Sequence, residues 1–162
     1  MLPSSWRPDL GRLLPDEPST YRGPALALWF TAVYLTVVAI RSLIHLFAAD
    51  GGAGSIATMD IDVEGGDNLV ALFGQWGAIQ LLLAAVLVVL VVRYRGLLPF
   101  VLLTLFVEPL LRALSGALKP IETTGPAPGA ALNDLVIPVI AVVLWASLCP
   151  ADRQEARQPV RR

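Results

Sequence analysis

The chain has 162 residues, of which 56% are hydrophobic, with a formal net charge of −1 and a mean hydropathy of +0.67. This composition is too apolar for an ordinary soluble domain, and the near-neutral charge excludes a basic nucleic-acid binder. The single cysteine, Cys149, excludes an intrachain disulfide and any paired-thiol motif. We therefore expect an all-α integral membrane protein that does not bind nucleic acid.

The first 23 residues are polar and rich in proline, with Trp6 among arginines and acidic residues. They predict an extended or briefly helical segment at the membrane interface, with Trp6 as an anchor. This segment is not expected to be a secretory signal, because it is a long leader that contains acidic residues and because the apolar run that follows is too long and carries Arg41.

Four apolar runs then predict a bundle of four transmembrane helices within one domain, residues 24–149. They cover residues 24–49, 69–92, 97–118 and 130–148. The link at residues 93–96 is so short that the second and third helices must be antiparallel neighbours. Residues 150–162 form a basic tail.

Basic residues near the ends of the runs predict the orientation of the bundle in the membrane. One side carries nine arginines, and the other carries Lys119, the only lysine. The nine are Arg7, Arg12, Arg22, Arg93, Arg95, Arg153, Arg157, Arg161 and Arg162. Both termini are thus expected in the cytoplasm, and the scarcity of lysine indicates a GC-rich bacterial genome. The expected location is the bacterial inner membrane.

Polar residues from all four runs are expected to form one layer nearer the outer surface. At roughly 1.5 Å of rise per residue, they lie about 5 to 16 Å below the outer boundary. The predicted ligand-binding residues are Arg41, His45, Gln75, Gln80, Glu108, Arg112, Asn133 and Asp134. Lipid cannot solvate such groups, so they should face other helices or water.

Helical spacing places several of these residues on common faces. One stripe contains Thr104, Glu108, Arg112, Ser115 and Lys119, and the other contains Thr31, Tyr34, Arg41 and His45. Pro109 and Pro138 each remove a backbone hydrogen bond next to this layer. We therefore expect the third and fourth helices to be kinked there, widening the bundle on its outer side.

A structural interpretation of the same residues stays open. Glu108 and Arg112 are four positions apart with the acid first, which favours an intrahelical pair. Arg41 could equally join helices by pairing with Asp134 or Glu108, and His45 could be a satisfied helix-end residue. The glutamines are typical of hydrogen bonds between helices. Trp29, Trp76, Trp145 and Tyr94 are expected to be interface anchors.

The first outer loop carries Asp60, Asp62 and Glu64 at alternating positions, like the opening of a calcium-binding EF-hand loop. The twelfth position is Ala71 instead of an acid, so we expect no metal. A solvated acidic loop, or a short strand over residues 55–63, is the favoured interpretation. No metal-ligand spacing, phosphate loop or activated nucleophile is present, which argues against a hydrolase or a metalloenzyme but leaves redox work on a bound quinone open.

Several segments resemble small bacterial four-helix membrane proteins of the DoxX-like kind. These are Gly65-Gly66-Asp67-Asn68, the glycine- and glutamine-bearing stretch of residues 72–80, Arg93-Tyr94-Arg95, and residues 110–115 with Arg112. The resemblance covers roughly residues 65–120. It implies a compact bundle and a link to membrane redox partners.

The leading hypothesis is a binding protein for a small amphipathic ligand, such as a lipid or quinone head group, in an outward-facing polar pocket. Arg41 and Arg112 would hold an anionic or carbonyl group while Glu108 balances their charge. No cofactor is expected beyond such a quinone or lipid, and membrane lipid is the expected partner. The alternatives are an accessory subunit of a larger membrane complex, with a protein partner or a second copy, and a proton-coupled carrier using Glu108 and His45.

Overall fold

The computed structural model describes residues 6–150, with the backbone alone described for residues 128–132. Its elements in chain order are η2 (Leu10–Leu13), α1 (Ala25–Phe47), α2 (Gly66–Arg93), η3 (Arg95–Leu97), α3 (Leu98–Leu118) and α4 (Pro128–Leu148). The described residues contain no strand. The prediction of an all-α four-helix bundle is therefore confirmed, while residues 151–162 of the basic tail lie outside the description.

Three helical segments are long and apolar enough to cross a bilayer, judged by length and composition. They are Ala25–Phe47, Gly66–Arg93 and Arg95–Leu118. The apolar stretch of α4 whose side chains the structure describes, Asn133–Leu148, is shorter than these three segments. These three helices make the chain a membrane protein.

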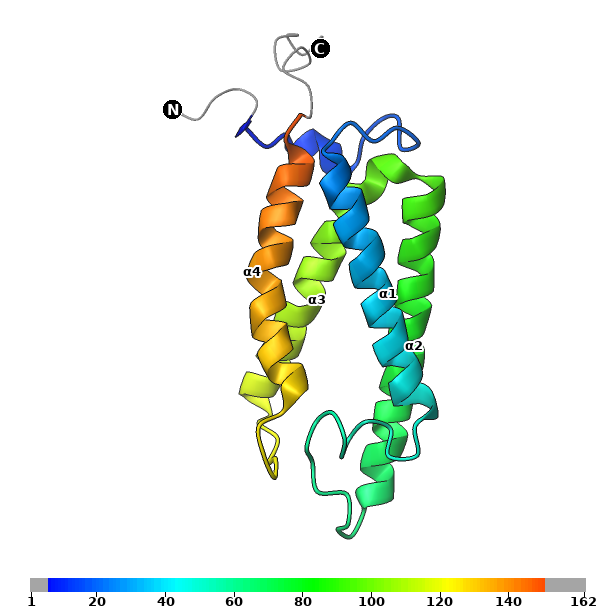
Figure 1. Ribbon diagram of the computed structural model, residues 1–162, viewed down its shortest axis with the longest axis vertical. Coiled ribbons are helices and arrows are strands. Elements are labelled where there is room, and N and C mark those ends of the chain that lie inside the picture. Colours follow the sequence, from blue (N-terminus) through cyan, green and yellow to red (C-terminus); the bar gives the residue numbers. More distant parts are fainter. Residues whose placement is uncertain (1–5, 151–162) are drawn as a thin grey trace.

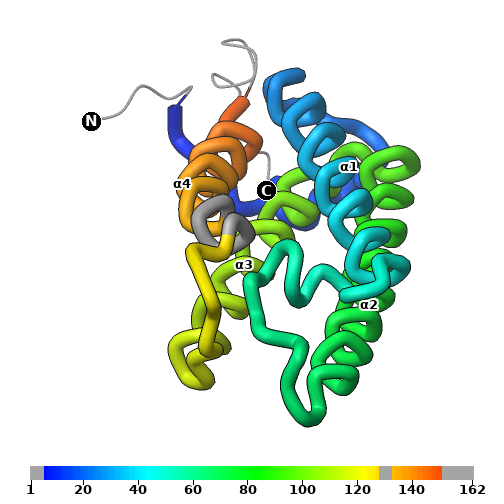
Figure 2. The backbone as a smooth tube through the Cα atoms, turned by 60° about the horizontal axis from the view of Figure 1, so that its bottom comes forward, coloured from blue at the N-terminus to red at the C-terminus, as the bar shows by residue number. Residues whose placement is uncertain are grey.

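The helices form two pairs (Figure 1). α1 packs mainly against α2, and α3 packs mainly against α4. We name the two ends of the bundle by what they carry. The terminal end, at the top of Figure 1, carries the segment before α1, the turn between α2 and α3, and the end of α4. The loop end carries residues 48–65 and 119–127, and there the two pairs stand apart (Figure 2).

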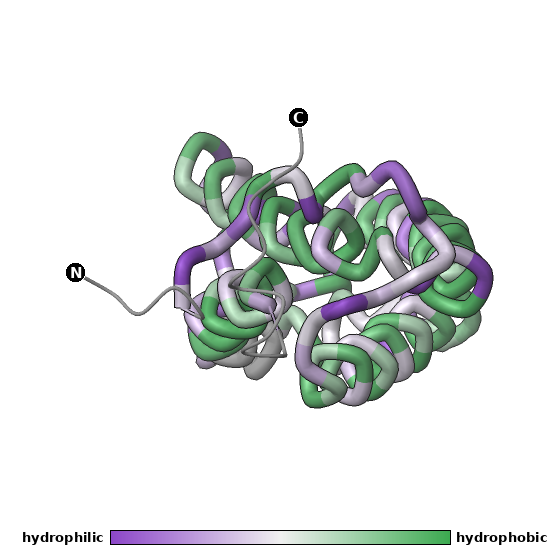
Figure 3. The backbone as a smooth tube through the Cα atoms, turned by 90° about the horizontal axis from the view of Figure 1, so that it is seen from above, coloured by the Kyte–Doolittle hydropathy of each residue, from purple (hydrophilic) through white to green (hydrophobic). Residues whose placement is uncertain are grey.

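Most of the apolar core lies in the half of the bundle near the terminal end. Leu98, Val101 and Leu102 in the first turns of α3 are fully buried. They pack with residues from the other three helices: Ala27, Leu35, Leu87 and Ile140. Apolar side chains also cover the outside of the helices, while hydrophilic residues gather on the segments that connect them (Figure 3). This distribution fits a protein whose solvent is lipid over most of its length.

α1 and α2 approach closely because Gly77 has no side chain. A β-carbon added there would lie 2.7 Å from Cβ of His45 and 2.9 Å from the carbonyl oxygen of Ser42. Small residues at a helix crossing allow the backbones to come together, which is the usual way helices associate in lipid.

The segment before α1 is docked across the terminal end. The backbone N–H of Asp9 donates to the carbonyl of Leu148 at 3.1 Å, and that of Gly96 donates to Pro18 at 2.7 Å. The Trp6 ring lies 5.8 Å from that of Trp145, centroid to centroid. The segment thus ties the end of α4 to the turn between α2 and α3.

The loop over residues 48–65 is built from turns, so the alternative of a strand at residues 55–63 is wrong. Thr58 joins this loop to the one before α4. Its carbonyl accepts from the backbone N–H of Thr124 at 2.8 Å, and its hydroxyl donates to the carbonyl of Gly125 at 2.9 Å. These bonds link the two helix pairs across the loop end.

Candidate ligand-binding site

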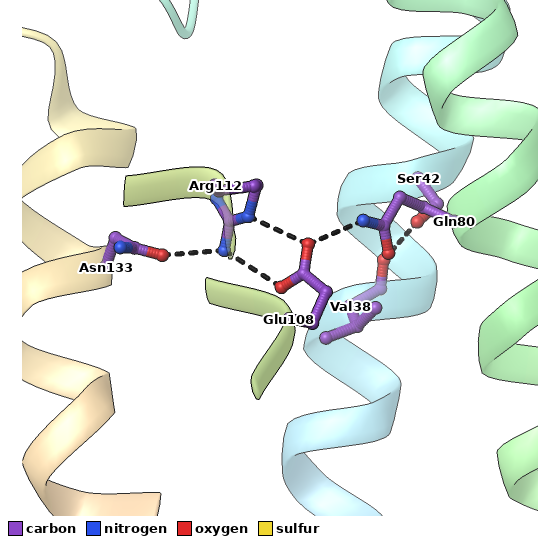
Figure 4. Close-up of polar contacts among 6 residues, drawn as sticks. All are labelled: Val38, Ser42, Gln80, Glu108, Arg112 and Asn133. Atoms are coloured by element: carbon purple, nitrogen blue, oxygen red, sulfur yellow. Dashed lines mark hydrogen bonds and ion pairs between the residues drawn. The ribbon is translucent and has the colours of Figure 1, made fainter. Parts of the chain in front are cut away.

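A hydrogen-bonded network connects three helices halfway along the bundle (Figure 4). Nε of Arg112 donates to Oε1 of Glu108 at 2.8 Å, within α3. Nε2 of Gln80, on α2, donates to the same oxygen at 2.6 Å. Nη2 of Arg112 donates to Oδ1 of Asn133, on α4, at 2.6 Å. Four of the eight predicted residues are therefore in direct contact.

The network contains the predicted intrahelical pair and extends beyond it. The side chains of Arg112 and Glu108 are 27% and 20% exposed, so both are largely removed from solvent. Charge-assisted hydrogen bonds are stronger than neutral ones, and more so at low dielectric. Glu108 consequently bridges the two helix pairs through Gln80, in addition to neutralising Arg112.

Two more predicted residues reach this region through Trp76 on α2. The guanidinium carbon of Arg41 lies 5.2 Å from the centroid of the Trp76 ring, and that of Arg112 lies 6.0 Å from it. The His45 ring is also close, with its centroid at 4.8 Å from that of Trp76. Trp76 was expected to be an interface anchor, whereas it contacts cations from α1 and α3.

His45 is buried and holds the start of the loop after α1. Its Nδ1 lies 2.7 Å from the carbonyl oxygen of Gly51. Since a carbonyl can only accept, Nδ1 is the protonated nitrogen in this contact. A β-carbon at Gly52 would lie 2.8 Å from the same nitrogen, so the loop requires a glycine there. This geometry favours the helix-end interpretation of His45.

Gln75 and Asp134 do not join the network, which corrects the expectation that all eight side chains face inward together. Both side chains are exposed, and no hydrogen bond or ion pair joins either of them to another side chain in the described ranges. The reason is rotational: Gln75 lies on the opposite face of α2 from Gln80, five residues away, and Asp134 is one position past Asn133.

A groove between α2 and α3 passes alongside Glu108 and Arg112. The groove has a volume of ≈ 580 Å³. It is lined by Leu83, Leu103, Thr104, Val107, Glu108, Leu111, Arg112 and Ser115. Four residues of the predicted α3 stripe are among them, so the stripe does face a common space. Lys119, the fifth, is exposed beyond the groove.

The groove opens on the flank of the bundle, where α2 and α3 would face lipid. Val107 and Leu111, which form part of its wall, are 39% and 60% exposed. From Leu103 to Ser115 the groove follows α3 for about 18 Å, at roughly 1.5 Å per residue. This opening differs from the outward-facing one expected from the sequence. The apolar groove residues were missed because leucine and valine are the background of every membrane helix.

The acidic loop offers no metal centre in the part of the chain that the structure describes. No group of three or more His, Cys, Asp or Glu side chains there is placed to hold a metal ion. Asp60 accepts a hydrogen bond from the backbone N–H of Asp62 at 3.0 Å. Asp50 accepts from the backbone N–H groups of Gly52 and Ser55, and these bonds lower the pKa of its carboxyl to about 2.

Comparison with family models, with curated proteins and with solved structures gave no match to this chain. The resemblance to DoxX-like proteins therefore stays a prediction.

Proposed function

We propose that the protein is a multi-pass inner-membrane protein that binds a small amphipathic ligand, with a lipid or quinone head group, in the groove between α2 and α3. The observation that supports the proposal is that apolar side chains and a charged pair line the same groove. Leu83, Leu103 and Leu111 supply an apolar wall, while Glu108 and Arg112 supply a charged pair on the same wall. Ligand sites are commonly apolar with a few polar groups that fix the orientation.

The proposed orientation places the terminal end in the cytoplasm, because Arg7, Arg12, Arg22, Arg93 and Arg95 all belong to it. α4 would be the fourth membrane span. Its 21 residues correspond to about 32 Å, enough for a hydrocarbon core of about 30 Å.

The test compares the ligand that co-purifies with the wild type and with two groove variants. Arg112→Leu removes the cation, and Val107→Trp adds bulk to the groove while every residue of the hydrogen-bonded network is kept. Mass spectrometry of protein purified in mild detergent should show a lipid or quinone on the wild type and several-fold less on both variants.

Val142→Trp is the matched control, since Val142 is an exposed valine on α4 away from the groove. It should retain ligand as the wild type does, and thermal unfolding should show that all three variants are folded. Equal ligand content in the wild type and both groove variants would contradict the proposal, as would a wild type that retains no ligand.

A further inference from the structure

The charges around Trp76 do not balance. Arg112 is neutralised by Glu108 at 2.8 Å. Arg41 has the Trp76 ring as its contact, and within the described residues no ion pair or hydrogen bond joins its guanidinium to another side chain. This part of the bundle therefore contains two guanidiniums, from α1 and α3, and one carboxylate that is paired with Arg112, which leaves the positive charge of Arg41 unbalanced.

That charge lies inside the membrane-spanning part of α1. Arg41 is six residues before the end of the helix at Phe47, or about 9 Å along its axis. A cation within a membrane span is costly, and a contact with an aromatic ring offsets only part of that cost. An anion beside Arg41 would remove the imbalance.

We propose that Arg41 and Arg112 together bind the phosphodiester of an anionic phospholipid, whose acyl chain occupies the groove between α2 and α3. The inference rests on the proposed function and names the ligand class of that site. Arg112 lines the groove and also lies by Trp76, so it connects the chain-binding surface to Arg41. Guanidinium groups match the geometry of phosphate oxygens, and a neutral quinone would leave the extra charge uncompensated.

The experiment measures binding of phosphatidylglycerol and phosphatidylcholine with identical acyl chains to the purified full chain, by native mass spectrometry. The wild type should bind the anionic lipid about tenfold more tightly, as expected for one added charge pair at reduced dielectric. Arg41→Gln should lose this preference while still binding both lipids. Arg41→Lys should keep part of it, because the charge remains without the planar fork.

Arg93→Gln is the control, because it removes an exposed cation at the terminal end. It should leave the preference unchanged, and an equal loss in Arg41→Gln and Arg93→Gln would overturn the assignment to Arg41. If inorganic phosphate alone displaced the lipid, the anion bound by Arg41 and Arg112 would be free phosphate, which would contradict the assignment to a phospholipid. Binding of both lipids without preference would overturn this inference and leave the proposed function standing, whereas absence of all lipid and quinone binding would overturn both.

Discussion

The two halves of the bundle are held together by different means. Near the terminal end, fully buried residues such as Leu98, Leu102 and Ile140 pack all four helices into one apolar core. Toward the loop end, the connection between the helix pairs depends on a few polar bonds, including Gln80 to Glu108 and Thr58 to Thr124. One half is a packed scaffold, and the other is a polar framework with a groove beside it.

The difference shows how a small membrane protein can fix its fold in one half and leave the other half less tightly packed. Lipid tails are as apolar as leucine, so apolar packing in a membrane gains dispersion energy and little hydrophobic free energy. Polar bonds specify which helix faces which. A groove can therefore exist in the loop-end half because the scaffold near the terminal end fixes the helices independently.

The largest expected effect comes from weakening the scaffold. Leu102→Ala should lower the free energy of unfolding by about 3 kcal/mol, because it leaves a cavity among fully buried neighbours. Leu114→Ala, at a position that is 54% exposed on the same helix, should change it by about 0.5 kcal/mol or less. Reversible unfolding in mixed micelles measures both values, and equal losses would contradict the division into two halves.

A smaller loss is expected where α1 and α2 cross. Gly77→Ala should destabilise the protein by about 2 kcal/mol, because the added β-carbon meets His45 and Ser42 at less than van der Waals distance. Gly74→Ala is the control one turn earlier, where the nearest atom would be the His45 carbonyl oxygen at 3.8 Å. If both variants were equally stable, the crossing would not depend on Gly77.

The smallest effect is expected at the loop end, where Asp50 stabilises a turn. The pKa of its carboxyl is lowered from 3.8 to about 2, so the folded protein favours the ionised form. Its contribution to stability is complete above about pH 4 and is lost as the pH falls toward 2. NMR shifts of the Gly52 and Ser55 amides should titrate with a midpoint near 2 in the wild type and not in Asp50→Asn. A midpoint near 3.8 would contradict the claim that the Gly52 and Ser55 amides stabilise the ionised carboxyl of Asp50.

The helices and the centre of the network could be predicted from the sequence because each depends on local spacing. Long apolar runs between polar or proline-containing breaks define helices whatever their neighbours are. Glu108 and Arg112 lie four residues apart, so they meet on any helix that contains both. Gln80 and Asn133 joined them because they lie at similar depths on the adjacent helices.

The remaining features depend on helix rotation and loop paths, which depth along a helix does not determine. Gln75 lies near Gln80 in sequence, yet it is exposed because it projects from another face of α2. Trp76 is an expected interface anchor by sequence, and its contacts with Arg41 and Arg112 depend on how α1 and α3 are placed around it. The pair Gly51 and Gly52 was a usable signal, since consecutive glycines after Asp50 indicate a turn with positive φ angles.

The contacts of Thr58 with Thr124 and Gly125 have a consequence for how molecules would reach the groove. They form a strap across the end of the bundle, while the wall of Val107 and Leu111 is left uncovered at the side. A ligand of the proposed site would then enter the groove from within the plane of the bilayer instead of from the aqueous side. Molecules already dissolved in the membrane would have the shortest route in.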